Sequence, residues 1–285
     1  KCAIIFLVWL AVDLPFLQAD DLLFFCGGRM WGSSQLTKRL RASGCQVKLV
    51  DSPNLAGLGG VSLKVFPTDP EPEARDGITP EFAQLAKYKA VMFNAIPAEY
   101  LSKLLNEERV QLLRVYVRNG GKLLLNCNAP EQLGDLLPVT FTGQLILPDL
   151  QVNRPALPAF QLLPAQWKKF TRYRPATAKE GAIVHCFMIK PGAEEEAVPG
   201  IVSQACGDGE VWFYNGDWTM QPSIVTAFCH WAYNSAFINA LVSEATGMPL
   251  DISKTIPTPP KPPKQEQLQE LSYEFKELQN LLQED

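Results

Sequence analysis

Short apolar runs alternate with amphipathic segments along the first half of the chain. Residues 21–26 are mostly apolar, and a helical pattern over residues 33–42 separates them from a second apolar run at residues 46–50. Two apolar runs joined by such a helix indicate a β-α-β unit, whose two strands are parallel. We therefore expect the folded part of the chain to begin as an α/β domain.

The same alternation continues toward the middle of the chain. Residues 88–93 form a third apolar run, and leucines and valines at helical spacing follow over residues 98–119. A Gly-Gly pair then breaks the helix before a fourth apolar run at residues 122–126, which ends in a polar, thiol-bearing tip. In an open α/β sheet, a buried strand that ends this way brings its last side chains to the crevice where ligands bind.

The second half of the chain is less regular. Residues 138–180 are rich in proline, with aromatic and basic residues intermixed, and we expect an insertion of short strands over the sheet there. The pair Gly207-Asp208 has the composition of a hairpin turn. Three more strands and a closing helix are expected at residues 182–189, 200–205, 211–214 and 224–245.

The amino-terminal residues resemble an export signal. Lys1 precedes an apolar run of residues 2–12, and a small residue, Ala19, stands before a polar junction. This arrangement is typical of a secretory signal peptide, and the run is shorter than the roughly 20 residues that span a bilayer. We predict cleavage after Ala19, giving a secreted or periplasmic protein. An uncleaved signal anchor is the alternative, and membrane attachment is expected only in that case.

Two further segments follow the expected α/β domain of residues 20–250. Residues 251–264 form a proline-rich linker, whose prolines favour a stiff, extended backbone. Residues 265–285 carry apolar side chains at spacings of three and four, which predicts an amphipathic helix. This helix either packs on its own domain or supports self-association or pairing with a partner helix.

Composition and charge narrow the classes of function. With 285 residues, 47% hydrophobic and 20% charged, the chain suits one large globular domain with appendages. The net charge of −4 gives no electrostatic reason to expect nucleic acid as a partner. The basic residues near 38–41 and 168–174 are interpreted as solvated faces.

Metal and cofactor sites are not expected. The seven cysteines are scattered without a CxxC motif, and the two histidines do not have metal-ligand spacing. Gly27-Gly28 follows the first strand but lacks the G-x-G-x-x-G pattern of dinucleotide-binding turns. If the chain is exported, some of the cysteines could pair.

Three stretches are informative through their order along the chain. Residues 104–125 form a helix that leads through Gly-Gly into a strand, residues 134–139 read Gly-Asp-Leu-Leu-Pro-Val, and residues 207–217 place a glycine turn before a late strand. In this order they resemble the class I glutamine amidotransferase-like superfamily. The likeness is to its non-catalytic branch, which includes the β-galactosidase trimerisation domain, and to amidotransferase-like proteins of bacteria. The resemblance implies a flavodoxin-like, mainly parallel sheet with helices on both faces, here with a β-rich insertion and a C-terminal helix.

The resemblance also focuses attention on Cys127. Catalytic members carry a cysteine nucleophile in a G-x-C-x-G elbow directly after a strand, followed later by a His-x-Glu pair. Cys127 lies where that nucleophile would be, but its neighbours are Asn126 and Asn128, and neither His185 nor His230 begins a His-x-Glu pair. A thiol needs a lowered pKa or a nearby base to attack an amide. One hypothesis is therefore an amidohydrolase using Cys127 with His230 or His185, and the other is a buried, inert thiol.

The tips of the expected parallel strands supply a second set of candidate residues. Asparagine and aspartate side chains form hydrogen bonds with hydroxyl groups, and tryptophan offers an apolar stacking face, a mixture that suits a sugar or polyol. Alternatively, the asparagines cap turns and the tryptophans complete the core. The candidates are Arg29, Trp31, Asn94, Asn126, Asn128, Asn215, Asp217 and Trp218.

The favoured interpretation is a secreted, catalytically degenerate amidotransferase-like domain. It would act as a binding or assembly module for a small molecule or carbohydrate, and the link to carbohydrate metabolism is an analogy at the level of the fold. The alternative is a cysteine-dependent, glutaminase-like enzyme.

Overall fold

A computed structural model describes nine segments of the chain. The amino-terminal segment with its expected signal peptide, part of the proline-rich linker and the expected helix at 265–285 lie outside them. Within the described residues, no helix is long and apolar enough to cross a membrane. The described segments are residues 21–26, 31–51, 82–94, 96, 101–102, 104–146, 150–169, 172–218 and 231–257.

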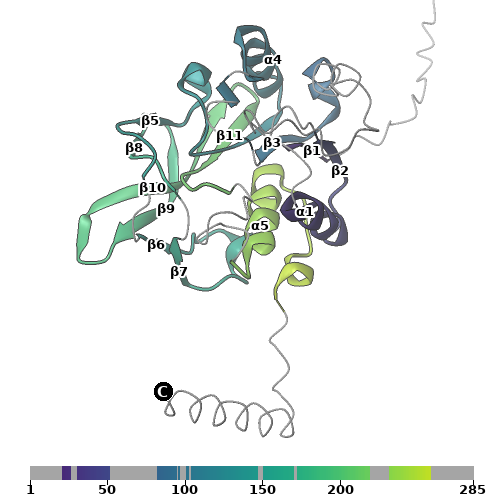
Figure 1. Cartoon of the computed structure of the whole chain (residues 1–285). Helices are drawn as coiled ribbons and strands as arrows, with labels where there is room; N and C mark the ends of the chain where they lie inside the picture. Colours follow the sequence, from purple (N-terminus) through teal and green to yellow (C-terminus); the bar gives the residue numbers. More distant parts are fainter. Residues whose placement is uncertain are drawn as a thin grey trace, which may run out of the picture.

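Nine strands of the described part form one mixed sheet (Figure 1). One half is parallel, and its order is β2-β1-β3-β4-β11. The strands of this half lie in short apolar runs, as the sequence predicts. They are β2 (Val47–Asp51), β1 (Leu22–Cys26), β3 (Ala90–Asn94), β4 (Lys122–Asn126) and β11 (Gly209–Tyr214).

The other half of the sheet is antiparallel, so the sheet as a whole is mixed. It continues from β11 through β10 (Ala193–Cys206) and β9 (Ile183–Lys190) to β6 (Leu150–Asn153) and β7 (Gln166–Lys169). The β9–β10 hairpin projects from the side of the molecule (Figure 1). The expected insertion therefore extends the sheet through β6 and β7.

A separate two-stranded sheet also comes from the insertion. It consists of β5 (Val139–Phe141) and β8 (Ala176–Ala178), which are antiparallel. Val139 and Ala176 belong to the core that α4 covers. The insertion is thus divided between the edge of the main sheet and one of its faces.

Helices cover both faces of the sheet. On one face lie α1 (Trp31–Ala42) and α5 (Asn234–Thr246), accompanied by the short helices η5 (Pro158–Phe160) and η7 (Ile252–Thr255). On the other face lies α4 (Glu107–Arg118), and Figure 1 shows the two groups on opposite sides. This double cover explains the continuous apolar runs, because successive side chains of each strand enter different cores.

The start and end of α4 follow from local chemistry. Asn106 accepts a hydrogen bond from the backbone N–H of Arg109 at 2.9 Å, and Glu107 and Glu108 place negative charge in the first turn. Gly120 has φ of 102° just after the helix, a conformation that glycine adopts without strain. The helix therefore turns directly into β4.

The β10–β11 hairpin packs tightly on the end of α4. Gly207 has φ of 64° in the turn, as its composition predicts. A Cβ added at Gly209 would lie 2.0 Å from the carbonyl oxygen of Val117 and 2.3 Å from that of Gly121. Two of the three stretches that carry the sequence resemblance are therefore in direct contact.

Candidate crevice at the strand tips

The tips of β4 and β11 meet at one edge of the parallel half-sheet. Asn126 pairs in register with Tyr214, so the residues that follow each strand lie next to one another. These residues are strongly buried, although many of them are polar. The structure thus brings together five of the candidate residues: Asn126, Asn128, Asn215, Asp217 and Trp218.

Three of these side chains make hydrogen bonds that support the local backbone. The Asn126 side chain accepts from the N–H of Asn128 at 3.1 Å. Asn215 accepts from the N–H of Arg174 at 3.0 Å and donates to the Arg174 carbonyl at 2.9 Å. The Trp218 indole donates to the carbonyl of Phe93 at 2.9 Å. These bonds tie the tips of β3, β4 and β11 to the segment after β7.

The carboxylate of Asp217 is the charged centre of this buried cluster of strand-tip side chains. One oxygen accepts from the side-chain amide of Asn128 at 3.0 Å, and the other accepts from the guanidinium of Arg172 at 3.0 Å. The N–H of Asp217 also donates to the carbonyl of Arg172 at 3.0 Å. Two buried polar atoms beside this network make no hydrogen bond, namely Asn128 Oδ1 and Arg172 Nε. One is an acceptor and the other a donor, and protein atoms enclose both of them.

Cys127 lies beside this network and is fully buried. Its thiol donates to the carbonyl of Arg172 at 3.5 Å. Four of the cysteines in the described residues are free thiols, namely Cys45, Cys127, Cys186 and Cys206.

His185 is held in a different part of the sheet. Its ring stacks on Trp212 with centroids 4.8 Å apart, and its Nε2 lies 2.9 Å from the hydroxyl oxygen of Ser203. Burial lowers the pKa of His185, against the opposing charges of Glu210 and Glu244. Because β10 and β11 lie between β9 and β4, the strands that carry His185 and Cys127 are about 14 Å apart. That separation is much longer than a nucleophile–base hydrogen bond.

The four remaining candidates have no described side chain. His230 and Arg29 lie outside the described residues. Trp31 begins α1 and Asn94 ends β3, but their side chains are not among those described. In the part of the chain that the structure describes, no three His, Cys, Asp or Glu side chains are grouped as a metal site requires.

Two arginines that the sequence pattern did not indicate contact the strand-tip cluster. Arg172 and Arg174 were expected on a solvated face, yet Arg172 pairs with Asp217 and Arg174 stacks over Phe141 with its guanidinium carbon 4.0 Å from the ring centroid. A usable signal was the alternation of Arg172, Tyr173 and Arg174, which is typical of an extended segment with one polar face.

No protein-family model matches the sequence, and no curated protein matches it. Several solved structures share its architecture. The cytoplasmic protein STM3548 from Salmonella typhimurium is 14% identical, with a TM-score of 0.53 over 79% of this chain and 98% of that chain. The cytoplasmic protein STM1381 from Salmonella typhimurium LT2 is 18% identical, with a TM-score of 0.53 over 79% and 99%.

A third match is to part of a larger enzyme. The β-galactosidase from Bacillus circulans sp. alkalophilus is 12% identical, with a TM-score of 0.48, and the match covers 81% of this chain and 32% of the enzyme. At these identities the comparisons establish a shared α/β fold with the two Salmonella proteins. The β-galactosidase match is too distant to support a conclusion.

Proposed function

We propose that this chain is a catalytically degenerate amidotransferase-like domain that acts as a binding or assembly module. The order of its parallel strands, β2-β1-β3-β4-β11, is the order of flavodoxin-like sheets. Cys127 directly follows β4, where the sequence resemblance expects a nucleophile. Both observations support membership of that superfamily.

The environment of Cys127 is the main observation against catalysis. A catalytic thiol must be open to its substrate and close to a base. The Cys127 thiol is fully buried and donates to the Arg172 carbonyl, and His185 is committed to Ser203 and Trp212 on a distant strand. Hydrolysis by a Cys127–His185 pair would require a large rearrangement of the sheet.

The polar network beside Cys127 supports a binding role. Asn128 Oδ1 and Arg172 Nε provide one acceptor and one donor, and the Asp217 carboxylate lies between their side chains. Both atoms are enclosed, so binding requires the segment that carries Arg172 to open; a hydroxyl group can then donate to the first atom and accept from the second. A sugar or polyol is therefore the ligand class that we propose, in line with the carbohydrate association inferred by analogy. We further propose export, on the basis of the signal-like residues 1–19.

Two assays test this function. The full chain should release no ammonia from glutamine or small amides, with or without Cys127→Ala. Activity that Cys127→Ala abolishes would overturn the proposal and favour the cysteine-dependent hydrolase, whose remaining candidate base is His230.

The binding half of the proposal is tested by calorimetric titration with galactose, mannose and glycerol. We expect binding of at least one of these probes, and Asn128→Ala should abolish it. Asn106→Ala, which removes the α4 cap away from the crevice, should leave that binding unchanged. Absence of binding by all three probes, or binding that survives Asn128→Ala, would contradict a polyol site in this crevice.

A further inference from the structure

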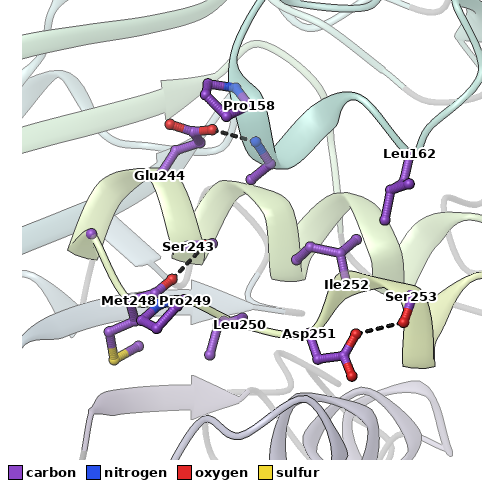
Figure 2. A pocket seen from close by; sticks show the side chains of 12 residues that line it. Pro158, Leu162, Ser243, Glu244, Met248, Pro249, Leu250, Asp251, Ile252 and Ser253 are labelled. Atoms are coloured by element: carbon purple, nitrogen blue, oxygen red, sulfur yellow. Dashed lines mark hydrogen bonds between the residues drawn. The ribbon is translucent and has the colours of Figure 1, made fainter.

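A groove lies at the carboxyl end of α5 (Figure 2). This groove has a volume of about 530 Å³ and lies among η5, the last turn of α5 and residues 247–253. Met248 Sδ lies 3.7 Å from Lys89 Nζ, just before β3, and the N–H of Asp251 donates to the carbonyl of Ser43. The groove is therefore near the amino ends of the parallel strands, at the opposite edge of the sheet from Cys127.

The walls of the groove are both apolar and negatively charged. Leu162 is 55% exposed at its rim, and Leu250 and further apolar side chains line it. Two carboxylates also line it: Glu244, which accepts from the N–H of Ala159 at 2.6 Å, and Asp251. No lysine or arginine is among the lining residues that the structure describes.

The end of α5 adds to the negative potential. Its last turn contains no basic residue, so the partial negative charge of the helix terminus is not offset there. Lys254 lies 3.5 Å from Asp251, but both side chains are about half exposed, so that ion pair is weak. The groove thus suits an apolar, rigid segment that carries positive charge.

We propose that this groove binds residues 258–264 of a second copy of the chain. The segment reads Thr-Pro-Pro-Lys-Pro-Pro-Lys, with four proline rings for the apolar wall. Lys261 and Lys264 supply positive charge to a groove whose described lining contains two carboxylates and no lysine or arginine. Proline-rich segments bind well in such grooves because little conformational entropy remains to be lost on binding.

The point at which the segment leaves the domain identifies a second copy as its source. Ile256 is already extended, with φ of −68° and ψ of 133°, immediately after η7, which borders the groove. A chain that leaves in this extended conformation would have to reverse at once to enter the groove of its own domain, whereas binding in the groove of a second copy requires no such reversal. Exchange in both directions gives a two-fold symmetric dimer.

Analytical ultracentrifugation of the full chain over a range of concentrations tests this inference. We expect a monomer–dimer equilibrium that weakens as salt is added. Lys261→Glu with Lys264→Glu should raise the dimer dissociation constant by at least about tenfold, because both charge pairs become repulsive. This variant changes only residues outside the described fold.

A second pair of substitutions tests the groove itself. Glu244→Gln with Asp251→Asn removes the charges but retains acceptors for Ala159 and Ser253, and it should weaken the dimer in the same direction. A circular-dichroism melt confirms that this variant is folded. The matched control for the substitutions at Lys261 and Lys264 is Lys38→Glu with Lys190→Glu, which makes the same charge change at exposed sites elsewhere and should not alter the equilibrium.

Three outcomes would overturn the inference. They are a monomer at every concentration, a dimer that is insensitive to the changes at 261 and 264, and a dimer that the control weakens equally. The inference does not depend on the crevice beside Cys127, so it can fail while the proposed function holds.

Discussion

The side-chain amide of Asn128 donates a 3.0 Å hydrogen bond to the carboxylate of Asp217. Asn128 follows β4 and Asp217 follows β11, so this bond joins the tips of two neighbouring parallel strands. The second carboxylate oxygen accepts from Arg172, which fixes the segment after β7 at the same point. The buried polar cluster beside Cys127 is therefore organised around one negative charge and its two donors.

Removing the negative charge of Asp217 should destabilise the fold. In Asp217→Asn, Arg172 loses its ion-pair partner, and we expect the free energy of unfolding to fall by about 2–3 kcal/mol. Urea denaturation measures the loss. This loss of unfolding free energy is smaller than the loss expected for a fully buried ion pair, because the Arg172 side chain is 39% exposed.

Asp135→Asn is the matched control for this prediction. Asp135 pairs with Arg114 and Arg118 but is half exposed, so its loss should cost less than about 1 kcal/mol. Equal losses in the two variants would show that the Asp217 network is no stronger than an exposed ion pair.

A methyl group at Gly209 should disrupt the contact between the β10–β11 hairpin and α4. The added Cβ would meet two backbone oxygens at 2.0 and 2.3 Å, and backbone atoms cannot move aside as a flexible side chain can. Gly209→Ala should therefore lower the unfolding free energy by about 3 kcal/mol or more. Urea denaturation is again the measurement.

Gly181→Ala is the control for Gly209→Ala. Gly181 has φ of 78° and no heavy atom within 4 Å of the added carbon, so only backbone strain of about 1 kcal/mol is expected. A loss at Gly209 no larger than that at Gly181 would contradict the close packing.

The parallel half of the fold could be predicted because burial on both faces leaves a clear trace in the sequence. Leu22 and Phe24 enter one core, and Leu23 and Phe25 enter the other, so β1 reads as an unbroken apolar run. The convergence of the β4 and β11 tips follows from parallel pairing.

The contacts among the strand-tip side chains could not be predicted from the sequence in the same way. Asn215 bonds to the backbone of Arg174, and Arg172 supplies the partner of Asp217. Both arginines belong to a proline-rich insertion without periodicity, whose path depends on tertiary packing. The four-residue strands β6 and β7 are likewise too short for a distinct alternation.

The partly buried imidazole of His185 should make stability fall in mild acid. Burial lowers its pKa below the ordinary value of 6.5, so the unfolded chain binds this proton more readily than the folded chain does. The unfolding free energy should therefore decrease as pH falls below about 6.5, with a slope of at most about 1.4 kcal/mol per pH unit for one proton.

The measurement is urea denaturation at several pH values between about 5.5 and 7.5, where histidine titrates. In His185→Gln, which keeps a polar partner for Ser203, the decrease toward low pH should be smaller than in the unchanged chain. Identical pH profiles would contradict the prediction. His230 is present in both proteins, so any contribution from it cancels in this comparison.

The reactivity of the cysteines separates the two interpretations of Cys127. Burial raises the pKa of Cys45 to about 12 and that of Cys186 to about 12, so neither should form thiolate near neutral pH. Cys206, at the end of β10, is partly exposed. In the folded chain, iodoacetamide should modify Cys206 at least about tenfold faster than Cys45, Cys127 or Cys186, since alkylation needs an accessible thiolate.

Peptide mapping by mass spectrometry assigns each modified cysteine, and labelling in urea serves as the control because all four thiols should then react at similar rates. Protection of Cys127 supports an inert thiol held against the Arg172 carbonyl. If Cys127 instead reacts faster than Cys206, then an accessible, activated thiolate exists in the folded chain. That result would favour the cysteine-dependent hydrolase, because such a thiolate is what amide hydrolysis requires and what the buried geometry opposes.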